Sequence, residues 1–314
     1  MSECIDKICA LYHGRRPIPG MDVAIVPGLL QCFGKEPKEL QEGLVQDYPI
    51  RKQGDEIVPG VVQWVHGSND ALRYRGNELM REKIWLQDGM PDEKGYAYYY
   101  YTGVQWEVVP AQTDWAQCPE VASVTNNLKL FNERVGAKPS NQAIITRYKN
   151  QDFGIGAHFD KPKSIAPSDK DGTSLITVIK TGDVGRKFNI YDLEENLLWG
   201  EVVAPGDAIV MTLEANLKTK HEVPIEKDAA IGDSGSIVFR SISSIVPFAE
   251  VMKKREASRK QKRKAREEKE LRKEAAVAAA KVSKEGGKYK VSIVPSSVSG
   301  DVPDVPVVKV ARVQ

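Results

Sequence analysis

Two short stretches decide the fold: residues 141–148 read Asn-Gln-Ala-Ile-Ile-Thr-Arg-Tyr, and residues 157–160 read Ala-His-Phe-Asp. They open a region, residues 141–240, in which short apolar runs alternate with turns rich in Gly, Asp, Asn and Pro. This pattern predicts eight strands, over residues 143–148, 155–159, 174–180, 187–192, 197–203, 208–213, 220–223 and 236–243. Short strands with no helix between them predict a jelly roll, whose mouth can hold a small molecule.

The second stretch also carries candidate metal ligands. In an extended strand, residues i and i+2 point to the same side, so His158 and Asp160 would project together. His221, one of four histidines in the chain, is the natural third ligand. Two imidazoles and one carboxylate form the facial set that holds non-haem Fe(II) and leaves positions open for a cosubstrate and dioxygen. Taken alone, the His-x-Asp tripeptide has another interpretation, an exposed pair at the end of a strand.

A cation follows at the end of the last predicted strand of this region. Arg240 closes a Val/Ile/Phe run nineteen residues after His221. A guanidinium there can pair with a carboxylate of a cosubstrate through two parallel hydrogen bonds. The spacing therefore adds an anion site to the candidate metal site.

Taken together, these motifs resemble a known family. The matching segments are the strand ending at Tyr148, His158-x-Asp160, Ser174-Leu175, residues 205–211, His221-x-Val223-Pro224, Ile237-Val238-Phe239-Arg240 and, upstream, the tyrosine-rich residues 98–103. Over residues 85–246 the chain resembles the Fe(II)/2-oxoglutarate-dependent dioxygenases, and within them the AlkB-like branch. The resemblance implies a double-stranded β-helix, iron held by His158, Asp160 and His221, and 2-oxoglutarate held by Arg240 with Tyr148 hydrogen-bonded to it.

The chain departs from the AlkB-like pattern at two positions. Many members carry two arginines six residues apart on the closing strand; Arg240 fits the second, and Ser234 stands at the first. Many also carry Asn two residues before the strand tyrosine, where this chain has Thr146, which we assign to the cosubstrate site. Either Arg240 alone binds the 2-oxoglutarate carboxylate or a cation from another strand does, the candidates being Arg147, Lys180 and Arg186.

A run of tyrosines upstream of the core bears on the substrate. Residues 96–101 are strongly strand-forming, and in a strand Tyr99 and Tyr101 share a face. That face, backed by Trp85, can stack a substrate base; the alternative is an ordinary strand with one buried tyrosine face. The AlkB-like resemblance implies hydroxylation of a methyl group on a nucleic acid base. The alternatives are a protein or small-molecule hydroxylase of the same superfamily, and a jelly-roll nucleic-acid-binding module without catalysis.

Charge is distributed unevenly along the chain. From residue 251 onward there are eighteen Lys/Arg against eight Asp/Glu, a net charge of +10, which leaves 27 against 35, a net charge of −8, for residues 1–250. The basic part favours nucleic acid as a partner, because phosphate neutralisation supplies much of that affinity. A charged tail that binds nothing is the alternative interpretation.

The predicted architecture is mainly β with flanking helices, an α+β arrangement in three parts. Residues 1–140 form an N-terminal extension and substrate lid, with a helix over 35–47 and another over 121–135. Residues 141–250 form the jelly-roll core. Residues 251–314 form a basic helical tail that becomes disordered.

The sequence also bears on the compartment. It has no run of eighteen apolar residues and no N-terminal signal pattern, so we expect neither a membrane partner nor secretion. Its four cysteines lack metal-binding spacing and are expected to be reduced. We therefore expect a cytoplasmic or nuclear protein.

Overall fold

The computed structural model describes residues 2–50, 62, 64, 73–74, 77–78, 81–88, 98–100, 108–110, 113–150, 152–160, 162, 165–226, 232–243, 248–284, 289–294 and 307–312. The chain divides into two compact units, Met1–Val251 and Met252–Gln314. Tyr101, the last tyrosine of the predicted strand, lies outside the described residues.

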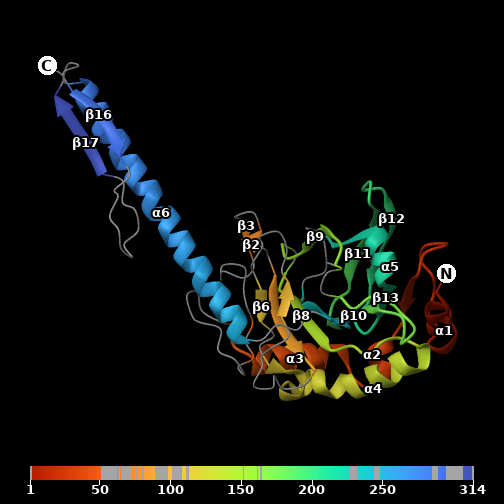
Figure 1. Cartoon of the computed structure of the whole chain (residues 1–314). Coiled ribbons are helices and arrows are strands. Elements are labelled where there is room, and N and C mark those ends of the chain that lie inside the picture. Colours follow the sequence, from red (N-terminus) through yellow and green to blue (C-terminus); the bar gives the residue numbers. More distant parts are fainter. Residues whose placement is uncertain are drawn as a thin grey trace. The chain divides into compact units, whose positions relative to one another are not determined.

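Two large β-sheets form the centre of the first unit (Figure 1). The major sheet has the order β1 (Val23–Val26), β13 (Ala208–Thr212), β10 (Leu175–Gly182), β15 (Ser234–Arg240), β8 (Gln142–Tyr148), β4 (Glu82–Gln87) and β7 (Thr113–Asp114). The minor sheet has the order β12 (Leu197–Val203), β11 (Arg186–Asp192), β14 (Thr219–Val223) and β9 (Ile155–His158). Neighbouring strands are antiparallel except for the pair β4 and β7.

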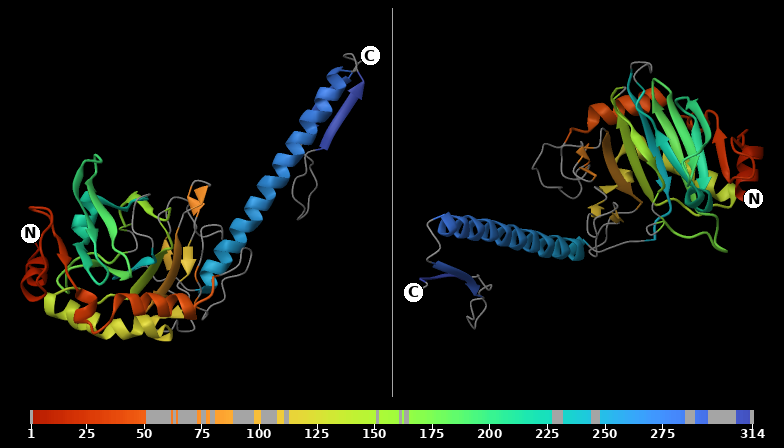
Figure 2. Two further views of the ribbon diagram at one scale, coloured as in Figure 1. Left: turned by 180° about the vertical axis from the view of Figure 1, so that it is seen from behind. Right: turned by 90° about the horizontal axis from the view of Figure 1, so that it is seen from above.

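Helices cover the outer face of the major sheet (Figure 2). They are α1 (Glu3–Leu11), α2 (Leu29–Cys32), α3 (Pro37–Asp47) and α4 (Pro119–Val135), while the short α5 (Leu213–Lys218) joins β13 to β14. Helix α4 begins with Pro119 in its first turn and ends at Gly136, whose φ of 74° lets its N–H reach the carbonyl of Asn132. Helices α3 and α4 confirm the two helices that the sequence predicts.

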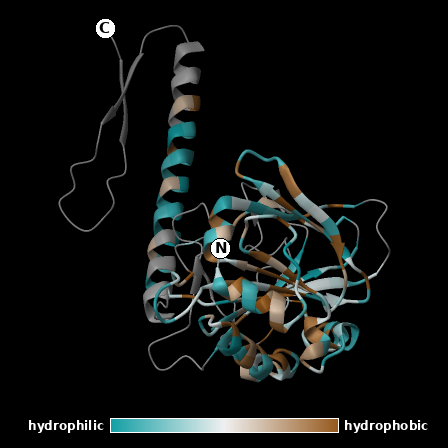
Figure 3. Cartoon of the chain, turned by 90° about the vertical axis from the view of Figure 1, so that its right-hand side faces the viewer, coloured by the Kyte–Doolittle hydropathy of each residue, from teal (hydrophilic) through white to brown (hydrophobic). Residues whose placement is uncertain are grey.

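The strands of the major sheet are buried on both faces, and their side chains alternate between two cores. In β1, Ala24 and Val26 pack toward the helices, and Val23 and Ile25 pack between the two sheets. Strands β10 and β13 alternate in the same way. This period of two creates an inner face, directed at the minor sheet, and an outer face, directed at the helices. The brown strand segments in Figure 3 show this apolar content.

Each of the eight strands predicted for residues 141–243 is present, with ends that differ by up to three residues. The order of the two sheets and their antiparallel pairing form a jelly roll, as predicted. Strands β1 and β4, which precede residue 141, belong to the same major sheet. Two further strand pairs precede the core: β2 (Arg73–Tyr74) with β3 (Asn77–Glu78), and β5 (Tyr98–Tyr100) with β6 (Val108–Pro110).

The C-terminal region contains α6 (Phe248–Lys284), whose described side chains are mostly polar and exposed, as the teal colour in Figure 3 shows. After it, β16 (Tyr289–Val294) and β17 (Val307–Arg312) form an antiparallel pair where the sequence predicts disorder. Alternating β-branched residues on both segments favour this pairing, and the Pro/Ser/Gly-rich composition between them concealed it. Among the described helices, none is long and apolar enough to cross a bilayer.

Candidate metal centre and its buried cations

The three predicted metal ligands come together. His158 ends β9 and lies directly opposite His221 of β14 in the antiparallel register, with ring centroids 4.4 Å apart. Asp160 follows two residues after His158, and the ligand atoms of the three side chains lie within 4.8 Å of one another. Two donors on one ion lie roughly 3–4 Å apart, so small side-chain rotations would bring all three onto a single ion.

A buried amide fixes the backbone of the carboxylate ligand. The Asp160 N–H donates to Asn216 Oδ1 at 2.8 Å, and Asn216 Nδ2 donates to the Asp160 carbonyl at 2.7 Å. Asn216 lies on α5, whose first turn is capped by the Thr212 hydroxyl, which accepts the Ala215 N–H. No sequence motif marks Asn216, so this positioning residue was missed.

Both histidines are held in a form that can bind metal. His158 Nδ1 lies 2.8 Å from the Gly156 carbonyl oxygen. Because a carbonyl can only accept, Nδ1 carries the proton and Nε2 keeps a free lone pair. The His221 ring stacks on Phe188, with centroids 5.7 Å apart and planes 10° apart. Burial lowers the pKa of His158 and of His221, so both imidazoles are neutral at neutral pH.

Arg240 pairs with the carboxylate of Asp160, a candidate metal ligand. Its Nη1 lies 3.1 Å from Asp160 Oδ2, and its Nη2 donates to Gln142 Oε1 at 2.6 Å. Burial acts to raise the pKa of Asp160, but the Arg240 guanidinium and the nearby histidines outweigh it, so the pKa lies below its usual value. Asp160 is therefore an anion at neutral pH. That Arg240 also contacts 2-oxoglutarate stays a prediction.

The inner face of the major sheet presents its side chains in rows, because β4, β8, β15 and β10 are aligned by register. One row contains Gln87, Gln142, Arg240 and Ile176; the next contains Trp85, Ile144, Val238 and Val178; the third contains Lys83, Thr146, Ser236 and Lys180; the fourth contains Tyr148, Ser234 and Gly182. The predicted cosubstrate residues thus share one face. The second row is apolar, and the rows on either side of it are polar.

Positive charge is buried on this side of the sheet. The cations are Arg81, Lys83, Lys180, Arg186 and Arg240. Arg186 is held by the structure around it: Nη2 donates to the carbonyls of Phe153 and Pro224, and Nε lies 3.6 Å from Glu226. Burial lowers the pKa of Lys83 well below its usual value, while Asp160 acts to raise it. Cations outnumber the carboxylates Asp160 and Glu226 here, so this face favours an anion.

Lys180 is a buried cation with little nearby charge to match it. Its side chain is 1% exposed, and its Nζ has no hydrogen-bond partner within the described part of the chain. It lies 5.5 Å from the centroid of the Tyr148 ring. Burial, with Arg186 nearby, lowers the pKa of Lys180 to about 7. The Ser234 hydroxyl, in the adjacent row, is also buried without a partner among the described residues.

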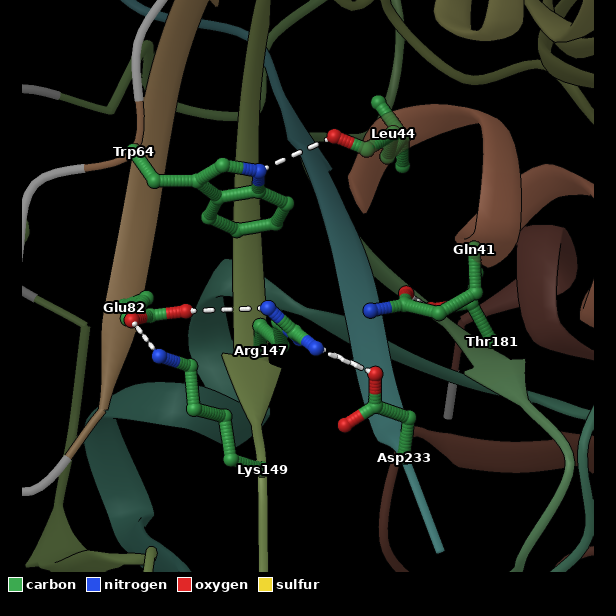
Figure 4. A network of polar contacts seen from close by, with 8 residues as sticks. All are labelled: Gln41, Leu44, Trp64, Glu82, Arg147, Lys149, Thr181 and Asp233. Atoms are coloured by element: carbon green, nitrogen blue, oxygen red, sulfur yellow. Dashed lines mark hydrogen bonds and ion pairs between the residues drawn. The ribbon is translucent and has the colours of Figure 1, made fainter. Parts of the chain in front are cut away.

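Arg147 lies on the opposite face of the sheet (Figure 4). It pairs with Asp233 at 2.5 Å and with Glu82 at 3.4 Å, and Lys149 reaches the same Glu82 carboxylate at 2.5 Å. Ala143 and Ile145, which share its side of β8, pack in the core beneath the helices. Arg147 therefore does not point toward the metal ligands.

The predicted stacking residues have different positions. Trp85 is buried on the inner face, beside Ile144, and its indole Nε1 has no partner among the residues that the structure describes. The backbone of Tyr99 lies in β5, opposite Val109, and its side chain is outside the description, as is Tyr101. That these tyrosines and Trp85 stack a base stays a prediction.

Comparison with known proteins found distant likenesses among solved structures. No protein-family model matches the chain, and no curated protein matches it. Solved structures similar to it include an oxidoreductase of the 2OG-Fe(II) oxygenase family from Burkholderia pseudomallei, at 12% identity and a TM-score of 0.42, covering 78% of this chain and 92% of that one. OsALKBH1 is similar at 14% identity and a TM-score of 0.39, covering 72% and 99%.

A prolyl hydroxylase from Trichoplax adhaerens, in complex with a hypoxia-inducible factor oxygen-degradation-domain peptide fragment, is similar at 10% identity and a TM-score of 0.40, covering 76% and 87%. Because these identities and TM-scores are low, we base the functional proposal on the residues of this chain.

Proposed function

We propose that the protein is an Fe(II)- and 2-oxoglutarate-dependent dioxygenase that hydroxylates a C–H bond. One observation carries the proposal: two histidines and one carboxylate converge within 4.8 Å, opposite a sheet face that buries excess positive charge. A jelly roll used only for binding has no evident need for both features. The donor set fits non-haem iron, and the cations fit a dianionic cosubstrate.

The residues of the chain would divide the work as follows. His158, Asp160 and His221 hold the iron, with Nε2 of His158 as the available donor. Arg240 keeps Asp160 charged and oriented, and Asn216 fixes the Asp160 backbone. When bound, iron with 2-oxoglutarate and dioxygen supplies the oxidising power for hydroxylation. The apolar row of the inner face, which includes the buried Trp85, would restrict water near this site.

We propose a methyl group on a nucleic acid base as the substrate. The exposed basic side chains of α6 support this, among them Arg259, Lys260, Lys262, Arg263 and Lys264. The acidic balance of residues 1–250 would weaken phosphate binding by the body, so the basic region would supply most of the affinity. A protein or small-molecule hydroxylase remains the competing function.

The metal and cosubstrate are tested together by anaerobic titration with Fe(II) and then 2-oxoglutarate. We expect stoichiometric iron binding, followed by the weak visible charge-transfer band of the chelate. Asp160→Ala should lose both, whereas Asp152→Ala, which removes an exposed carboxylate eight residues earlier, should retain both. Iron binding without the band would point to another cosubstrate. Failure of the wild-type protein to bind iron would overturn the enzymatic function.

The substrate class is tested by salt dependence and product. Binding to a methylated single-stranded oligonucleotide should weaken steeply with added salt, with a log–log slope of about −0.7 per phosphate neutralised. Turnover should release formaldehyde from an N-methylated base, or leave a hydroxymethyl group on a C-methylated one. Binding that is indifferent to salt, with no modified base, would favour the protein or small-molecule hydroxylase.

A further inference from the structure

Lys180 is a buried cation whose role the iron site leaves open. It comes from the inner face of β10, in the middle of the major sheet, and lies next to Ser236 of β15 in register. A buried lysine without a hydrogen-bond partner is unfavourable for folding, because its charge loses the solvation of water. Such a group persists where a ligand supplies the missing partner.

The two other cations that the sequence offered for the cosubstrate are committed elsewhere. Arg147 is on the outer face, paired with Glu82 and Asp233. Arg186 donates to the carbonyls of Asn150, Phe153 and Pro224, and so ties together the chain segments around β11. Of the three candidates, Lys180 alone combines the inner face with an ammonium that lacks a partner among the described residues.

The polarity of the rows matches the carbon chain of 2-oxoglutarate. Arg240 lies in the first row, beside the metal ligand Asp160, and Lys180 lies in the third. The first and third rows are four residues apart along β15, so their backbone positions lie about 13 Å apart. The long side chains of Arg240 and Lys180 bring their charged groups closer together than that. Between them lies the apolar row of Ile144, Val238 and Val178. A ligand with an acid group at each end and methylene groups between them fits this order.

We propose that Lys180 binds the far carboxylate of 2-oxoglutarate, with the hydroxyl groups of Ser234 and Tyr148 beside it. Lys180 would thus take the part of the arginine that Ser234 replaces. The inference rests on the proposed function, since it assumes that the iron site uses this cosubstrate. Lys180 is a binding residue in this account and takes no part in the oxidation.

A lysine in this role makes cosubstrate binding depend on pH. The charged and titratable groups that face Lys180 are Tyr148 of β8, Arg186 of β11 and Glu226 beyond β14; β15 contributes only serines. Burial raises the pKa of Tyr148 to about 12, and arginine does not titrate, whereas the pKa of Lys180 is lowered to about 7. Above that pH the neutral amine must take up a proton before it can pair with the carboxylate, so affinity falls by up to tenfold per pH unit.

Calorimetric titration of the Mn(II)-loaded protein with 2-oxoglutarate tests the inference without turnover. For the wild-type protein we expect weaker binding at pH 8.5 than at pH 6.5, with proton uptake visible as a dependence of the enthalpy on the buffer. Lys180→Met should bind roughly 10- to 100-fold more weakly, with unchanged Mn(II) affinity and no such proton uptake. Lys180→Arg should restore binding and remove the pH dependence. Lys129→Met, an exposed lysine on α4, is the matched control.

A matched ligand separates the far carboxylate from the rest of the molecule. The acid 2-oxopentanoate has the same carbon chain with a methyl group in place of that carboxylate. The wild-type protein should prefer 2-oxoglutarate over it, and Lys180→Met should lose the preference. If Lys180→Met retains both wild-type affinity and preference, the inference is overturned while the proposed function stands. If the Mn(II)-loaded wild-type protein does not bind 2-oxoglutarate, the proposed function fails and the inference fails with it.

Discussion

The two faces of the seven-stranded sheet both bury charged side chains, but they balance those charges differently. On the outer face, Glu82 pairs with Arg147 and Lys149, and Asp233 pairs with Arg147 (Figure 4). On the inner face, Lys180 has no hydrogen-bond partner among the residues described. The same strands contribute to both faces: on β8, Arg147 points to the outer face and its neighbour Tyr148 to the inner face.

The difference indicates what each face contributes. Removing a charge from water is unfavourable by several kcal/mol unless a partner compensates for it. The outer face supplies its partners from within the chain, so its network supports the fold. The inner face leaves a cation without a hydrogen-bond partner among the described residues, and we propose that a ligand supplies that partner at the expense of stability. Four substitutions would break or sharpen this contrast.

The largest loss of stability should come from the outer face. Glu82→Ala removes a carboxylate that is 0% exposed and leaves Arg147 and Lys149 without it. We expect the free energy of unfolding to fall by about 3 kcal/mol, because one partner of a buried ion pair is removed. Urea denaturation measures the change. Glu42→Ala, at an exposed i,i+4 pair with Lys38 on α3, should change it by less than about 0.5 kcal/mol.

The opposite sign is expected on the inner face. Lys180→Met should raise the free energy of unfolding by roughly 1–3 kcal/mol at pH 7 without ligand, because it removes a buried charge that has no hydrogen-bond partner in the described part of the chain. The pKa of Lys180 is about 7 in the folded protein and about 10.4 when unfolded, so between these values the unfolded chain binds more protons. Wild-type stability therefore rises with pH from about 7 toward 10.

Urea denaturation at pH 7 and pH 9 would show this, with the advantage of Lys180→Met over the wild-type protein shrinking at the higher pH. A destabilised Lys180→Met protein at pH 7 would mean that the ammonium is matched within the chain. Both faces would then balance their buried charges within the chain.

A smaller effect is expected at the amide that positions Asp160, the proposed iron ligand. Asn216→Ala removes both hydrogen bonds to the Asp160 backbone. Groups that orient metal ligands typically alter metal affinity by about 10- to 100-fold, and we expect Fe(II) binding to weaken within that range. Competition with a metal chelator measures it. Asn196→Ala, which changes an exposed turn asparagine bonded to Asp192, should leave the iron affinity unchanged.

The smallest effect is expected at the partner of Arg240. Gln142→Leu removes the acceptor of the 2.6 Å hydrogen bond from Arg240 Nη2 but leaves the pair with Asp160. We expect a loss of about 1–2 kcal/mol in the free energy of unfolding, and a change in iron affinity smaller than that of Asn216→Ala. Thermal unfolding and the same chelator competition would test this order. A larger effect on iron than that of Asn216→Ala would assign Gln142 to the metal site.

Sequence reasoning reached the strands of the core and the three candidate ligands. Alternation placed His158 and Asp160 on one side, and the separation of the strands by turns marked the jelly roll. It did not identify Asn216, because the sequence of the short helix α5 resembles a polar turn. It also did not identify Lys83 and Arg81, because their place beside the site depends on the register between strands that are far apart in sequence.

The choice among Arg147, Lys180 and Arg186 was also out of reach, for a physical reason. Strands β8 and β10 are buried on both faces, so apolar and polar residues do not alternate and nothing marks which side is inner. Only the packing of the helices on one side defines the two faces. The hairpin of β16 and β17 was missed because composition outweighed alternation.

The place of β15 in the major sheet bears on how the protein is made. It is the last strand of that sheet in the sequence, yet it lies between β10 and β8, near the middle of the strand order. During synthesis, the chain through β14 offers two partial sheets whose exposed edges both await the same segment. The pairing of β15 with β8 and β10 therefore joins distant parts of the chain, which favours slow folding. Because Arg240 arrives with β15, the carboxylate ligand gains its partner only as the sheet closes.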